Sequence, residues 1–173
     1  MKQGESIYDK SLFSFSQVKK TLIKFLKIAG YEIITDEIIG FVKPDIYARK
    51  QKYEIVISIK EKVEGALDAC RDLAAMKCFL GGKKDYVLAL PPVSEAMVLQ
   101  FLIEKDEWYY PLAEQAMTIW LANPDRMEVH PIMGWPYDES LVNYLTNPEA
   151  ATMISQYVSQ KMSQKMLDEE DLY

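Results

Sequence analysis

Asp45, Ser58 and Lys60 are the residues whose types and spacing could do chemistry in this chain. They fall in the stretch KPDIYARKQKYEIVISIKEK, residues 43–62, where apolar and polar residues alternate along two segments. Such alternation predicts two strands, and it places all three side chains on the same polar face. A lysine that ends a buried strand needs a partner or a cleft. We therefore expect the carboxylate of Asp45 and the ammonium of Lys60 to meet in one cleft.

The two strands are predicted to form a hairpin with a two-residue turn at residues 50–51. That register places Asp45 opposite Val56 and diagonally about 7–8 Å from Ser58. The second strand is largely β-branched, and a helical pattern and another apolar strand follow it. This order favours a buried αβ layer over the alternative, a free hairpin with a solvated polar face.

Pro44-Asp45 on the first strand and Ser58-Ile59-Lys60 on the second resemble the signature of the restriction-endonuclease-like superfamily, the PD-(D/E)XK nucleases. That signature is a Pro-Asp on one strand, then an acid, any residue and a lysine at the end of the next strand. This chain departs from it at one position, because Ser58 stands where the family has its second acid.

The resemblance covers roughly residues 16–103 and includes the elements that follow the motif. These are a helix at about 64–80, an apolar strand that begins at Asp85, and a helix near 94–103. The resemblance implies an α/β fold of three layers, in which helices flank a mixed central β-sheet.

In the family, two carboxylates and a backbone carbonyl hold a divalent cation, usually magnesium, that assists phosphodiester cleavage. Carried over to this sequence, the resemblance makes Asp45 and the carbonyl of Ile59 metal ligands. It makes Lys60 the group that positions the attacking water. With Ser58 in place of the second acid, we expect magnesium to bind weakly and cleavage to be weak or lost.

An acid from the following helix is the alternative source of the missing ligand, and Asp68 and Asp72 lie one turn apart there. Glu54 is on the correct face but about 13 Å back along the strand, which is too far. With a migrated acid the chain would be an active magnesium-dependent DNA endonuclease. A non-catalytic protein-interaction module on the same fold is a third interpretation.

The charge distribution favours nucleic acid as a partner. Residues 1–90 hold 16 Lys and Arg against 12 Asp and Glu, whereas residues 91–173 hold 4 against 14. Such asymmetry is typical of a basic binding surface on an acidic body. The basic residues of the motif region are the candidate nucleic-acid contacts: Lys43, Arg49, Lys50, Lys52 and Lys62.

Length and composition predict one domain over residues 1–173, with an acidic, helical C-terminal extension from about residue 138. No apolar stretch approaches a membrane span, and the polar N-terminus lacks the apolar region of a signal peptide, so we expect a cytoplasmic protein. Cys70 and Cys78 are expected to be reduced core thiols. The resemblance also implies a homodimer.

Overall fold

The computed structural model describes residues 13–35, 37–93 and 118–149, together with isolated positions at 98 and 100 and, after 149, at 152, 153, 156, 160, 163, 164, 167 and 168. A six-stranded sheet in the order β1-β2-β3-β4-β5-β6 forms its centre. The pairs β3–β4 and β4–β5 are parallel, and the other three pairs are antiparallel. The strands are β1 (Glu32–Ile34), β2 (Ile46–Lys50), β3 (Tyr53–Ile59), β4 (Asp85–Leu90), β5 (Thr118–Asn123) and β6 (Glu128–Met133).

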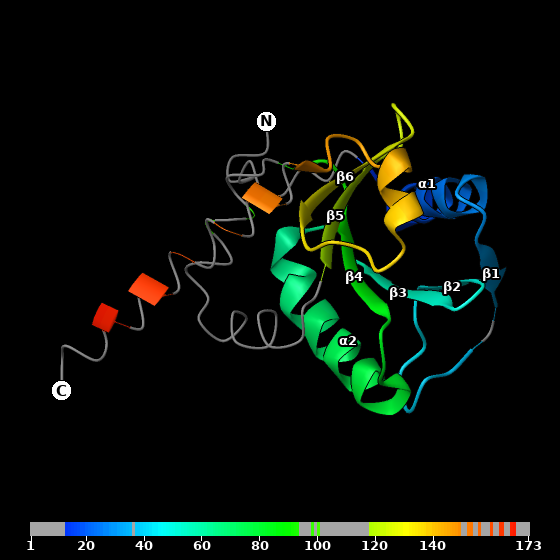
Figure 1. Cartoon of the computed structure of the whole chain (residues 1–173), viewed down its shortest axis with the longest axis horizontal. Helices are drawn as coiled ribbons and strands as arrows, with labels where there is room; N and C mark the ends of the chain where they lie inside the picture. Colours follow the sequence, from blue (N-terminus) through cyan, green and yellow to red (C-terminus); the bar gives the residue numbers. More distant parts are fainter. Residues whose placement is uncertain are drawn as a thin grey trace, which may run out of the picture.

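Two helices cover opposite faces of this sheet, as Figure 1 shows: α1 (Phe15–Ile28) and α2 (Ala66–Leu80). Alternate residues of the strands divide between two hydrophobic clusters. Ile55, Ile57 and Ile59 pack with α1, while Val56 packs with α2, as the alternation of a strand requires. The predicted α/β fold, a mixed sheet between helical layers, is confirmed.

Helix α1 forms because its sequence contains both a cap and an apolar stripe. Ser14 is the N-cap, and its side chain and that of Gln17 make the reciprocal hydrogen bonds of a capping box. Leu22 and Leu26, one turn apart, are completely buried against the sheet. These features fix how α1 lies on the sheet, and therefore where its polar residues reach.

The hairpin turn lies one residue later than the sequence predicts. Lys50 pairs with Tyr53, so the turn is at Gln51 and Lys52, and Gln51 has a positive φ of 54°. The register shift brings Val56 opposite Tyr47 instead of Asp45. A two-residue turn with positive φ matches the right-handed twist of the flanking strands, which explains why this register is preferred.

Other boundaries differ from expectation where short-range structure intervenes. The helix expected from residue 64 begins at Ala66, after a 3₁₀ turn η1 (Val63–Gly65), and the segment after Asp138 is a 3₁₀ helix, η2 (Glu139–Tyr144). The helix expected near 94–103 falls largely outside the described residues. Both cysteines are free, but only Cys70 is buried, so the expectation of a core position is wrong for Cys78.

Candidate functional site

Asp45 is the centre of the candidate site and comes directly before β2. Its backbone N–H donates to the carbonyl of Ile57 at 3.1 Å. Its carboxylate accepts a hydrogen bond from the backbone N–H of Ile59 at 2.7 Å. The side chain thus takes the place of a strand acceptor at the end of β3 and is held there by the backbone.

The electrostatic surroundings of Asp45 are set by burial and by lysines from two different elements. Burial raises the pKa of the Asp45 carboxyl, while the Ile59 N–H and the charges of Lys60 and Lys19 act in the opposite direction. The negative charge of Asp72 raises it further. The result is a partly buried carboxyl with a raised pKa, faced by two ammonium groups and one second carboxylate.

Ser58 lies in β3 and Lys60 directly follows it, so both are near the end of that strand. Because Ile57 and Ile59 point to the α1 face, Ser58 points to the α2 face, where it is 5% exposed. Lys60 follows β3, and its backbone N–H donates to the carbonyl of Ala89 at 3.1 Å. A Cβ on Gly65 would lie 3.1 Å from Cδ of Lys60, so the absence of a side chain there leaves room for the lysine.

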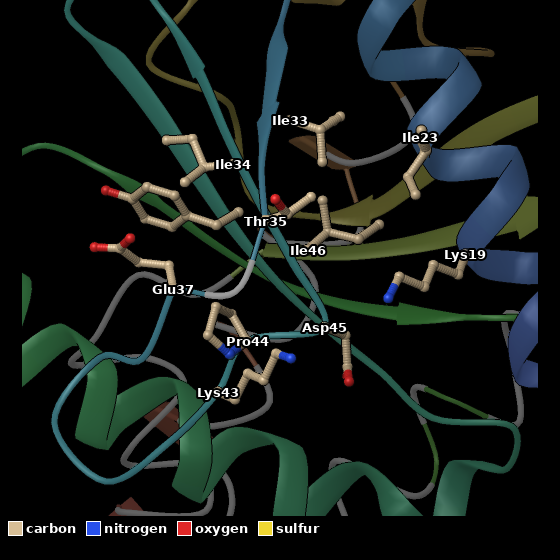
Figure 2. A pocket seen from close by; sticks show the side chains of 11 residues that line it. Lys19, Ile23, Ile33, Ile34, Thr35, Glu37, Lys43, Pro44, Asp45 and Ile46 are labelled. Atoms are coloured by element: carbon tan, nitrogen blue, oxygen red, sulfur yellow. The ribbon is translucent and has the colours of Figure 1, made fainter.

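A pocket of about 240 Å³ opens beside Asp45, at the edge of the sheet formed by β1 and β2. In Figure 2 the ammonium groups of Lys19 and Lys43 extend toward this space, on which the Asp45 carboxylate also borders. Lys19 is a site residue that the sequence interpretation missed. No sequence spacing connects Lys19 with Asp45, because only the packing of α1 on the sheet brings the two residues to the same pocket.

The acidic residues offered as replacement ligands are placed unequally. Asp72 is partly buried and close enough to Asp45 to raise its pKa, whereas Asp68 is exposed. Glu54 does not serve as a replacement ligand, because its carboxylate forms an ion pair with Lys84 at 3.0 Å. Among the described residues there is no group of three or more His, Cys, Asp or Glu that could hold a metal ion. Glu37 lines the pocket together with Asp45, and Asp72 acts on the pKa of Asp45 from α2.

The basic residues in and around the hairpin differ in their ion pairs and in their exposure to solvent. Arg49 pairs with Glu54 at 3.0 Å and remains half exposed. Lys50 is drawn inward by Asp138, with its Nζ 3.5 Å from Oδ2. Lys43, Lys52 and Lys62 are exposed. Lys52 lies at the hairpin turn, at the other end of β2 from Asp45, whereas Lys43 lines the pocket together with Asp45.

A second polar cluster, which the sequence interpretation did not anticipate, lies at the far end of β4. Asp85 and Asp138 are 4% and 3% exposed. Asp138 accepts hydrogen bonds from the hydroxyl of Tyr31 at 2.8 Å and from that of Ser140 at 2.6 Å, and Lys50 lies beside it. Both oxygens of Asp85 accept from the backbone N–H of Tyr137 at 3.3 Å. The cluster attaches the chain around η2 to the sheet.

Comparison with known proteins adds little. No protein-family model matches the chain, and no curated protein matches it. A solved structure of an FdxN element excision controlling factor protein from Anabaena variabilis is similar in fold, with 14% sequence identity and a TM-score of 0.47. The match covers 66% of this chain and 95% of that one. Similarity at this level says nothing about what this chain binds. No helix among the described residues could cross a membrane.

Proposed function

We propose that this chain is a nucleic-acid-binding protein with a restriction-endonuclease-like fold, in which metal-dependent phosphodiester cleavage is weak or lost. One observation carries the proposal. Lys19 lines the pocket together with Asp45, the charges of Lys19 and Lys60 lower the pKa of the Asp45 carboxyl, and Ser58 occupies the place of the second acid in the motif. The pocket beside Asp45 is lined by Lys19 and Lys43, groups that can bind a phosphate, whereas Ser58 and Lys60 do not line it.

Charge balance explains why a metal would bind poorly. Magnesium is a small, hard cation that sheds its water reluctantly and needs negatively charged oxygen ligands to do so. Here the charge of Asp45 is already offset by Lys19 and Lys60. A divalent cation bound here would be attracted by one or two carboxylates but repelled by the two lysine charges. The net attraction would be weak.

The same balance suits a phosphate group. Lys43 borders the pocket together with Lys19, and Lys62 follows Lys60 after one residue. Ammonium groups that contact phosphates of a nucleic-acid strand give affinity without sequence preference.

Asp72 supports a second candidate, the active magnesium-dependent endonuclease. Its carboxylate lies close enough to Asp45 to affect the pKa of that group. If Asp72 has replaced the missing acid, Asp45, Asp72 and the Ile59 carbonyl together would hold the cation. Measurements of metal binding and of DNA binding distinguish this candidate from a non-catalytic protein-interaction module.

The proposal is tested by fluorescence anisotropy with labelled DNA across a salt series in the presence of EDTA. Wild-type protein is expected to bind with modest affinity that falls steeply with salt. The Lys43→Glu/Lys62→Glu double variant should bind less tightly and reduce the salt slope by about two. Lys24→Glu is the matched control for one charge reversal, because Lys24 is exposed on α1 and does not line the pocket. No binding by wild type, or equal losses for the control, would refute the proposal.

A further inference from the structure

Two phenylalanine rings from separate parts of the chain meet on the surface. Phe41, in the loop between β1 and β2, is 98% exposed, and Phe79, near the end of α2, is 61% exposed. Their centroids are 6.4 Å apart and the rings are nearly perpendicular, at 84°. Ile38, in the same loop, is 68% exposed. Neighbouring large apolar side chains at such exposure indicate a surface that contacts something else.

The loop is built to hold Phe41 outward. Ile39 and Val42 form a β-bridge with hydrogen bonds of 2.8 and 3.1 Å, and Ile39 is buried in the core with 4% exposure. Between them Gly40 has a φ of +63°, and a Cβ there would lie 2.2 Å from the Phe79 ring. A buried anchor and a tight turn thus place the ring of Phe41 on the surface.

Charge around the rings points to the partner. Lys43, two residues after Phe41, is exposed and borders the Asp45 pocket, and Lys83 is exposed just after α2. Glu37 is the acid of the described 37–43 segment. Each ring is thus followed within four residues by an exposed lysine, and an aromatic side chain with cations nearby along the chain matches a strand that carries phosphates on one side and bare bases on the other.

Chain length sets how far the rings are from the candidate site. Phe41 and Asp45 are four residues apart, so their Cα atoms are separated by at most about 14 Å. One strand of nucleic acid advances about 3.4 Å per nucleotide in a helix. A strand whose phosphate lies at Asp45 and Lys60 therefore reaches the Phe41 ring within a few nucleotides.

We propose that Phe41, supported edge-on by Phe79, stacks on an unpaired base, so that the chain prefers single-stranded or frayed nucleic acid to intact duplex. The inference rests on the proposed function and specifies its substrate class. Bases in a duplex are stacked on one another and cannot offer a face to the ring, whereas unpaired bases can.

Anisotropy measurements with an oligonucleotide of about 16 nucleotides, alone and annealed to its complement, test this inference. Phe41→Ala should weaken single-strand binding about tenfold and leave duplex binding unchanged. Phe41→Trp should retain or improve single-strand binding, because the larger ring stacks at least as well. Tyr144→Ala is the matched control, since Tyr144 is an exposed aromatic residue at 44% exposure in η2.

The outcomes separate this inference from the proposed function. If Lys43→Glu/Lys62→Glu weakens binding while Phe41→Ala binds the single strand as wild type does, the stacking role is refuted and the nucleic-acid function stands. If wild type binds neither form, both are refuted. If Phe41→Ala converts a dimer to a monomer in analytical ultracentrifugation without affecting nucleic-acid binding, the rings contact a second copy of the chain and the inference is overturned.

Discussion

The carboxylate of Asp45 and the backbone N–H of Ile59 are joined by a hydrogen bond of 2.7 Å, so the acid of the first motif strand is fixed to the end of the second. The bond gives the carboxylate a defined position without any metal. It also makes Asn a close substitute, because the side-chain oxygen of Asn can accept the same bond while carrying no charge.

Ser58→Glu tests whether the missing acid is what prevents metal binding. Ser58 is 5% exposed, so a glutamate there buries a charge near Asp45 and should lower the melting temperature in EDTA. Saturating manganese should then raise the melting temperature of the variant by roughly 5–10 °C, and that of wild type very little. Ser58→Gln, similar in size and uncharged, is the control. A manganese response from Ser58→Gln, or none from Ser58→Glu, would count against a simple loss of the second ligand.

Asp85 makes the stability of the fold depend on pH. Burial raises the pKa of Asp85 to about 7, helped by the charge of Asp138 and opposed by the Tyr137 N–H. Because the folded state holds its proton more tightly than the unfolded state, stability should fall as pH rises between about 4 and 7. Asp85→Asn keeps an acceptor for the Tyr137 N–H but carries no buried charge. Above pH 7 the variant should therefore be more stable than wild type by roughly a few kcal/mol.

Urea unfolding at three pH values measures this effect. The other groups of the cluster, Tyr31, Lys50, Asp138 and Ser140, remain in the variant and serve as an internal reference. Wild-type and variant curves that run parallel from pH 5 to pH 8.5 would show that Asp85 does not titrate in this range.

Tyr86 and Tyr47 form a matched pair of buried phenols with opposite expectations. The Tyr86 hydroxyl is buried and has no hydrogen-bond partner among the described residues, whereas the Tyr47 hydroxyl donates to Glu54. Tyr86→Phe should therefore leave stability unchanged or raise it by up to about 1 kcal/mol, and Tyr47→Phe should lower it by about 1 kcal/mol. Chemical denaturation decides, and a clear loss for Tyr86→Phe would reveal a partner for its hydroxyl.

Local sequence signals predicted the elements that local physics controls. The alternation along residues 53–59 predicted β3, and its isoleucines Ile55, Ile57 and Ile59 do share one buried face. The sequence predicts the hairpin turn one residue too early. Gln51 adopts a positive φ in the turn, and glutamine is not a residue type that favours positive φ.

The features that sequence could not supply depend on contacts between distant segments. The hydrogen bond from Tyr31 to Asp138 spans 107 residues, and no spacing rule connects such a pair. Lys19 lines the Asp45 pocket because α1 packs on the face of the sheet. Asp45 and Lys60, by contrast, flank one hairpin, so the expectation that they share a face needs only the alternation of the two strands.

Asp45→Asn gives the most direct test of the central claim, that lysines and not a metal prepare this cleft for nucleic acid. The measurement is DNA affinity of wild type and variant by anisotropy, each in EDTA and in manganese. We predict that wild-type binding is the same in both conditions, and that Asp45→Asn binds more tightly because a negative charge leaves the neighbourhood of Lys19 and Lys60. Wild-type binding that requires manganese and is weakened by Asp45→Asn would contradict the account and establish a working metal site.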